Sequence, residues 1–133
     1  MRPAFADTVG LIALWDRSDQ WHAAAEEAFA LLTRSATALY TTSFVLLECA
    51  NSAARKPYRP AVDELRIELE RGGFLIHPTD DDWRQAWESY VRGDADRAGV
   101  VDHVSFLVMR RLGIVHALTN DRHFRAAGFQ VLF

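Results

Sequence analysis

Four acidic residues stand at positions where a sheet of alternating strands and helices would bring them together. Asp7 follows a short apolar segment near the N-terminus, and Asp121 follows another near the C-terminus. Asp102 falls in the first turn of a predicted helix, and Glu48 lies inside a second one. Open parallel sheets bind ligands beyond the carboxyl ends of their strands. We therefore expect the four carboxylates to converge on one edge of such a sheet.

Glu48 is the acid that is hardest to explain as an ordinary surface residue. It directly follows the apolar run Phe44–Leu47, and Phe44 shares its helical face at a spacing of four. This arrangement indicates partial burial, and a buried carboxylate needs a partner. The nearest following cation is Arg55, and no Lys or Arg precedes it in this segment. A metal ion is the simplest partner for Glu48.

The other acids each have a simpler alternative. Asp7 and Asp121 could cap the short helices that follow them, and Asp102 could complement the dipole of its own helix. The run Asp80–Asp82 also invites a metal site. N-capping and favourable first-turn charges are sufficient to explain that run, and we prefer this explanation.

The densest basic patch follows the Glu48 helix. It consists of Arg55, Lys56 and Arg59, with Tyr58 among them. Together with Arg122, these cations are candidates for contacts with phosphate, although they also fit ordinary solvated charges. His103 and His123 adjoin two of the acids, and either histidine could position a substrate or simply lie at the surface.

Short apolar segments alternate with longer amphipathic ones along the whole chain. The predicted strands cover residues 3–6, 38–41, 74–77, 114–118 and 129–132. The predicted helices cover residues 9–15, 20–32, 43–55, 60–72, 80–90, 100–112 and 121–127. Strands that alternate with helices indicate a mainly parallel sheet covered on both faces. We expect an α/β fold with three layers, α/β/α, and four to five strands.

Composition limits the classes of protein that remain. The 133 residues are 50% hydrophobic, which is enough for a core and fits a single domain over residues 1–133. The longest early apolar run, Val9–Trp15, is too short to span a membrane. The single Cys49 excludes internal disulfides and fits a reducing cytoplasm. We expect a cytoplasmic protein without a membrane partner.

Four short motifs in order resemble the PIN-domain ribonucleases, especially the VapC-like toxins of toxin–antitoxin modules. The first is Asp7-Thr8, and the second runs from Thr41 to Glu48. The third runs from Asp102 to Phe106, and the fourth runs from Ala117 to Phe124. The resemblance covers nearly the whole chain and implies a PIN-like, Rossmann-like fold.

The resemblance also implies a site and a reaction. Carried over by position, Asp7, Glu48, Asp102 and Asp121 would be catalytic and would hold one or two Mg²⁺ or Mn²⁺ ions. The polar residues that usually support such a site match Thr8, Ser105 and Thr119. The implied activity is metal-dependent hydrolysis of RNA phosphodiester bonds, leaving a 5′-phosphate and a 3′-hydroxyl. An antitoxin partner and a homodimer are also implied. Trp83 and Trp87 could form the dimer contact, but packing in the core explains these tryptophans equally well.

Three features run against this expectation. Val9 stands where many members have a small polar residue, and Gly99 stands where a Ser or Thr often caps the Asp102 helix. A net charge of −3 is unusual for a protein that binds nucleic acid, but the negative charges of the four candidate ligands account for more than all of it. An RNA-processing nuclease without an antitoxin and a non-catalytic RNA-binding module remain as alternatives.

Overall fold

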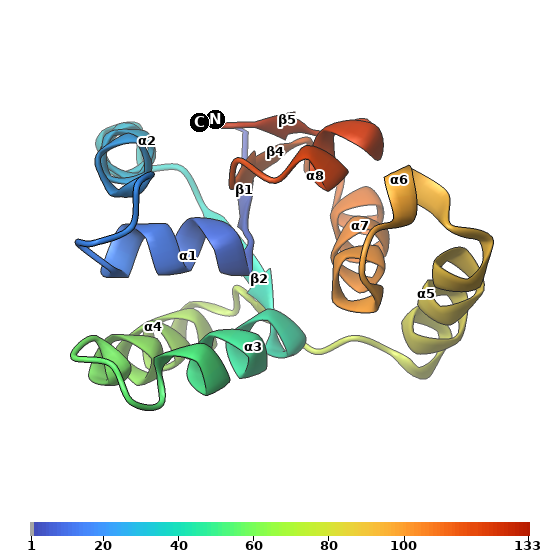
Figure 1. Cartoon of the computed structure of the whole chain (residues 1–133), viewed down its shortest axis with the longest axis horizontal. Helices are drawn as coiled ribbons and strands as arrows, with labels where there is room; N and C mark the ends of the chain where they lie inside the picture. The colour runs from blue at the N-terminus through green and yellow to red at the C-terminus, as the bar shows by residue number, and fades with distance from the viewer. Residues whose placement is uncertain (1) are drawn as a thin grey trace.

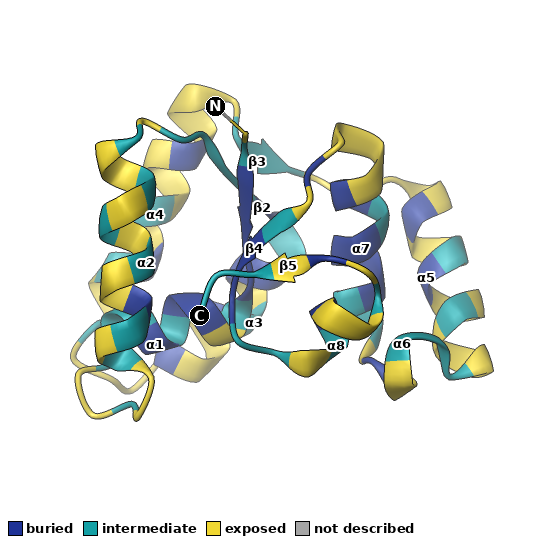
Figure 2. Cartoon of the chain, turned by 90° about the horizontal axis from the view of Figure 1, so that it is seen from above, coloured by how far each residue is buried: buried dark blue, intermediate teal, exposed yellow. Residues whose placement is uncertain are grey.

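The computed structural model describes residues 2–133, and five parallel strands form its centre. They are β1 (Ala4–Ala6), β2 (Leu39–Thr42), β3 (Leu75–Ile76), β4 (His116–Leu118) and β5 (Gln130–Val131). Their order in the sheet is β3-β2-β1-β4-β5, and every neighbouring pair is parallel. β1 is the central strand and is buried along its whole length, as Figure 2 shows.

Helices cover both faces of this sheet (Figure 1). On one side lie α1 (Thr8–Trp15), α2 (His22–Arg34), α3 (Ser43–Ala53) and α4 (Arg59–Gly72). On the other side lie α5 (Asp80–Arg92), α6 (Asp94–Arg97), α7 (Val100–Leu112) and α8 (Arg122–Ala126). The predicted three-layer α/β/α class with a parallel sheet is therefore confirmed. No helix in the described part of the chain is both long and apolar enough to cross a membrane.

Local sequence signals explain where the helices begin. Thr42 caps α3, and its side-chain oxygen accepts a hydrogen bond from the Val45 N–H at 3.1 Å. α5 begins with a capping box in which Thr79 and Asp82 bond each other's backbone N–H groups. Asp82 also forms an ion pair with Arg111 at 2.6 Å. The run Asp80–Asp82 thus serves the start of this helix, and Thr79 is the N-cap itself.

Two parts of the chain differ from the sequence-based expectation. α6 was not predicted, because three successive residues, Ala95–Arg97, have positive φ, and such a turn has no hydrophobic period. The helix predicted over residues 20–32 begins later than expected. Trp21 is the residue before α2 and is 45% exposed.

One close approach joins the helical layer to the sheet. Gly10 of α1 lies against the end of β4, where an added Cβ atom would come within 1.8 Å of the Leu118 carbonyl oxygen. Only a residue without a side chain fits there. Gly10 therefore sets how closely α1, and with it the end of β1, approaches β4.

The main core is built from the sheet and the inner faces of the helices. Its largest fully buried side chains include three aromatic rings, Phe5, Phe106 and Phe124. Phe106 of α7 and Phe124 of α8 meet edge to face at 4.9 Å between ring centroids. This packing fixes the two elements that carry Asp102 and Asp121.

Candidate active site

The order in which strands are added to the sheet reverses between β1 and β4. From β1 the chain moves to β2 and β3 on one side, and it returns to β4 and β5 on the other. Asp7 directly follows β1, and Asp121 lies three residues after β4. These two acids therefore flank the topological switch point, which is the usual ligand site of an open parallel sheet.

Asp7 is the most buried of the four acids, with 2% of its surface exposed. Burial raises the pKa of Asp7 to about 8, and the nearby charge of Asp102 adds to the effect. The Thr119 hydroxyl donates to Asp7 Oδ2 at 3.1 Å. The Thr119 hydroxyl oxygen in turn accepts from the Asp121 N–H at 3.1 Å. Asp7 occupies the N-cap position of α1, but its side chain makes no capping bond. The simpler explanation for Asp7 is therefore wrong.

Glu48 is half-buried and is held by a neighbouring helix. The Thr8 hydroxyl at the start of α1 donates to Glu48 Oε1 at 2.6 Å. This bond joins residues 40 positions apart in the sequence and aims the carboxylate toward the end of β1. Within residues 2–133 no Lys or Arg pairs with Glu48.

Asp102 and Asp121 meet across the site from α7 and the start of α8. Burial, together with the charges of Asp121 and Glu48, raises the pKa of Asp102 to about 6, while the charge of His123 opposes them. Asp121 caps α8, since its Oδ1 accepts from the His123 N–H at 2.9 Å. Asp121 therefore both caps a helix and faces the other acids.

His123 is a site residue whose role the sequence left open. Its Nδ1 lies 2.8 Å from Asp121 Oδ1. One ligand atom from each of Asp102, Asp121 and His123 lies within 4.8 Å of the others. The only signal in the sequence was the position of His123 two residues after Asp121, which places both side chains at the start of one helix.

The donor set fits a hard divalent cation. Among the described residues, none of the four carboxylates has an ion-pair partner except Asp121, which pairs with His123. Carboxylate oxygens are the ligands that Mg²⁺ and Mn²⁺ prefer. Like charges that raise one another's pKa are stabilised when such an ion binds among them. The arrangement is therefore suited to holding a cation against a phosphate group.

Two of the three predicted supporting residues contact the acids, and the third does not. Thr8 and Thr119 contact the acids as described above. Ser105 is fully buried on α7, and its hydroxyl has no hydrogen-bond partner within residues 2–133. His103 is also buried, and burial lowers its pKa.

The predicted phosphate contacts lie outside the cluster of acids. Arg122 is exposed and forms an ion pair with Asp96 at 3.2 Å. Arg55, Lys56 and Arg59 are exposed around the connection between α3 and α4.

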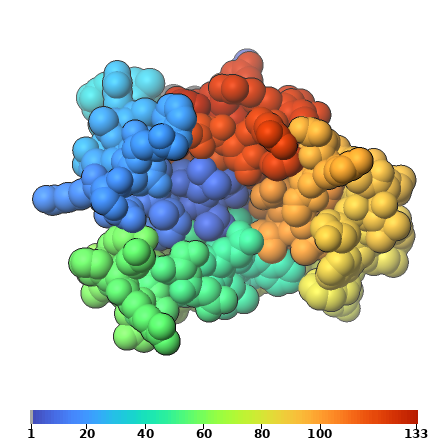
Figure 3. Space-filling model, viewed as in Figure 1, coloured from blue at the N-terminus to red at the C-terminus, as the bar shows by residue number. Residues whose placement is uncertain are grey.

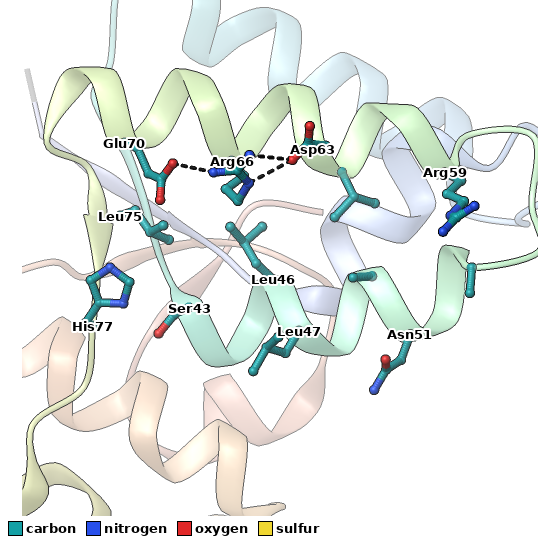
Figure 4. Close-up of a pocket in the computed structure, with 13 residues that line it drawn as sticks. Ser43, Leu46, Leu47, Asn51, Arg59, Asp63, Arg66, Glu70, Leu75 and His77 are labelled. Atoms are coloured by element: carbon teal, nitrogen blue, oxygen red, sulfur yellow. Dashed lines mark hydrogen bonds and ion pairs between the residues drawn. The ribbon is translucent and has the colours of Figure 1, made fainter.

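A separate cavity of about 590 Å³ lies between α3 and α4 (Figure 4). Its floor is apolar and includes Leu46 and Leu75, and ion pairs of Arg66 with Asp63 and Glu70 cross one side of it. None of the four acids lines this cavity. It is therefore distinct from the acidic site.

The raised pKa of Asp7 predicts how the stability of the metal-free protein depends on pH. Between about pH 4 and pH 8 the folded state holds a proton on Asp7 that the unfolded state releases, so the free energy of unfolding falls as pH rises. We expect Asp7→Asn to stabilise the metal-free protein near pH 8 by up to about 5 kcal/mol, because a pKa raised by one unit corresponds to about 1.4 kcal/mol. Urea denaturation in the presence of a chelator measures this difference.

The control for this prediction is the same comparison near pH 3, where Asp7 is protonated in both the folded and the unfolded state. There the two proteins should have nearly equal unfolding free energies. Equal stability of Asp7→Asn and wild type at both pH values would show that Asp7 is not destabilised by its surroundings.

Comparisons with known proteins agree with this geometry. The family model described as "PIN domain" matches residues 4–130. The 23S rRNA-specific endonuclease VapC20 of Mycobacterium tuberculosis, strains CDC 1551 / Oshkosh and H37Rv, is 36% identical over 126 residues, which cover 94% of each chain.

Two solved structures extend the comparison. The crystal structure of Mycobacterium tuberculosis VapC20, a Sarcin-Ricin loop cleaving toxin, matches with a TM-score of 0.76 and 31% identity, covering 95% of each chain. FitAcB from Neisseria gonorrhoeae matches with a TM-score of 0.64 over 98% of this chain and 96% of that one. Its 13% identity supports the fold alone. The chain belongs to the PIN-domain family and, within it, to the VapC-like proteins.

Proposed function

We propose that this protein is a divalent-metal-dependent endoribonuclease and the toxin of a toxin–antitoxin pair. The observation that carries the proposal is the convergence of Asp7, Glu48, Asp102 and Asp121 at the switch point without a Lys or Arg partner in the described chain. The similarity to VapC20, a 23S rRNA-specific endonuclease, over 94% of the chain supports the choice of RNA as substrate.

The chain supplies both the ligands and their orientation. The four carboxylates would hold one or two Mg²⁺ or Mn²⁺ ions, which when bound would activate water and stabilise charge on a phosphate. Thr8 holds the Glu48 carboxylate, and Thr119 links Asp7 to the backbone of Asp121. The ligands are thus positioned in advance by hydrogen bonds from neighbouring elements.

The cations outside the site would guide the RNA. Arg55, Lys56 and Arg59 present exposed positive charge near the end of α3, the helix that carries Glu48. Arg122 lies beside Asp121, and its exposed ion pair with Asp96 is weak enough to exchange for a phosphate. An antitoxin would silence the enzyme by placing a basic or bulky segment among the four acids.

Substitution of one ligand tests the catalytic assignment. We expect Asp102→Asn to lower the rate of RNA cleavage in Mn²⁺ by at least about 100-fold, because it removes a ligand charge. The matched control is Asp80→Asn, an exposed acid at the start of α5 that should leave the rate unchanged. Cleavage at the wild-type rate by Asp102→Asn would refute the assignment. A wild-type protein that binds RNA without cutting it would favour the binding-module alternative.

Metal binding has a readout that is independent of cleavage. An ion that binds only the folded state stabilises it by about 2.7 kcal/mol at 100 times its Kd. We expect Mn²⁺ or Mg²⁺ to raise the melting temperature and a chelator to reverse the change, with calorimetry as the measurement. Asp102→Asn should lose most of this shift, and Asp80→Asn should retain it. A melting temperature that is insensitive to both ions would argue against the metal site.

We also propose a homodimer formed through α5. Trp83 and Trp87 are 54% and 39% exposed, so core packing does not explain them. With Phe44 and Tyr90 they form a ladder of edge-to-face aromatic contacts at centroid distances of 5.4–6.3 Å. A second copy would bury this ladder.

Light scattering tests the dimer. The wild-type chain should have about twice its monomer mass in solution, whereas Trp83→Ser combined with Trp87→Ser should be monomeric, because the change removes the apolar contact area. The control is Phe29→Ser, an exposed aromatic residue on α2, on the other side of the sheet. A monomeric wild-type protein would refute this interface.

A further inference from the structure

A second cavity, of about 520 Å³, lies at the far end of α1 from Asp7. Two aromatic rings line it: Trp15, the last residue of α1, and Tyr58, the residue before α4. The rings are stacked, with centroids 6.3 Å apart and an angle of 27° between their planes. Both side chains are half-buried and pack against the main core. The rings therefore form a supported platform that borders an open space.

The surroundings of this platform are basic. Arg17 and Lys56 line the same cavity, and Arg55 and Arg59 flank Lys56 in the sequence. None of these four cations forms an ion pair with any of residues 2–133, in contrast to the paired arginines of α4 and α5 such as Arg66 and Arg84.

Asp16 is the one acid among the residues that line the cavity. Its Oδ1 accepts hydrogen bonds from the Ser18 N–H at 2.9 Å and the Ser18 hydroxyl at 2.6 Å. Asp16 thus orders the loop after α1, and the hydrogen bonds from Ser18, with a smaller contribution from the charge of Lys56, lower its pKa. The cavity combines flat rings with two cations that form no ion pair with any of residues 2–133.

The platform and the acidic site lie at opposite ends of the same helix. α1 starts directly after Asp7 and ends at Trp15, and its eight residues span about 12 Å. Figure 1 shows α1 running from the middle of the molecule to one edge, where its following loop and the α3–α4 connection lie on the same side. In Figure 3 these two regions, blue and green, lie against each other on the face that is shown.

We propose that the Trp15–Tyr58 platform, with Arg17 and Lys56, is a subsite for an unpaired base and its phosphate, a few nucleotides from the cleaved bond. The inference rests on the proposed function, since it needs RNA in the acidic site. Aromatic rings stack on any base, and nearby cations bind the backbone. RNA fits the cavity better than a protein segment does, because stacked rings, unpaired cations and an adjoining phosphate-cleaving site occur together here.

The test measures RNA affinity without cleavage. In an Asp102→Asn background, fluorescence anisotropy follows binding of an unstructured, labelled RNA of about 12 nucleotides, a length within the site sizes of single-strand binders. We expect Tyr58→Ala to weaken binding about 10-fold and Trp15→Ala to weaken it at least as much, while Trp15→Phe retains most of the affinity because it keeps a ring. The control is Phe29→Ala, which should bind as the background protein does.

Charge gives a second readout that does not depend on core packing around Trp15. Each phosphate contact contributes about 0.7 to the slope of log affinity against log salt for single strands. Lys56→Gln should therefore reduce this slope by about 0.7, whereas Arg66→Gln, which alters a cation already paired with two acids, should leave it unchanged.

Each outcome decides between the alternatives. Unchanged affinity in Tyr58→Ala together with an unchanged salt slope in Lys56→Gln would overturn the subsite. If these variants instead weaken binding of the antitoxin and not of RNA, the occupant is a protein and the proposal is also wrong. The proposed function is judged separately, by whether the protein without substitutions cleaves RNA in Mn²⁺.

Discussion

The burial and crowding of carboxylates at the end of the central strands is the constraint on which the rest of this structure depends. Asp7 is almost completely buried, and its pKa is raised to about 8, first by burial and then by the charge of Asp102. The pKa of Asp102 in turn is raised to about 6, first by burial and then by the charges of Asp121 and Glu48. A fold that places these groups together gives up stability in its metal-free form. The same crowding is what suits the site to a divalent cation.

The surrounding fold holds the acids in place against the repulsion among their charges. The central position of β1 buries Asp7, and Gly10 lets α1 approach the end of β4 closely. Hydrogen bonds from Thr8 and Thr119 connect residues 40 and 112 positions apart, so they link α1 to α3 and β1 to the segment after β4. Aromatic packing between α7 and α8 fixes the other half of the site. The constraint is therefore distributed over both helical layers.

Much of the fold could be predicted because local signals were strong. The order of strands and helices follows from hydrophobic periodicity and from glycine and proline positions, and all five strands were found. α6 could not be predicted, because the left-handed turn Ala95–Arg97 depends on its packing between α5 and α8 and not on residue preference. Whether Trp83 and Trp87 were core or surface residues was equally undecided, since an amphipathic pattern does not show which helix face finds a partner.

The sequence by itself determined which residues are the candidates for the chemistry: four acids, three of them next to a predicted strand end or helix start and Glu48 within a helix, in the order typical of PIN domains. Tertiary structure decided how these residues behave. It buries Asp7, brings Asp102 to Asp121 and His123, leaves the Ser105 hydroxyl without a partner in the described chain, and stacks Trp15 on Tyr58. The physical reason is that burial and pKa depend on groups distant in the chain. Only the packing of the layers brings those groups into contact.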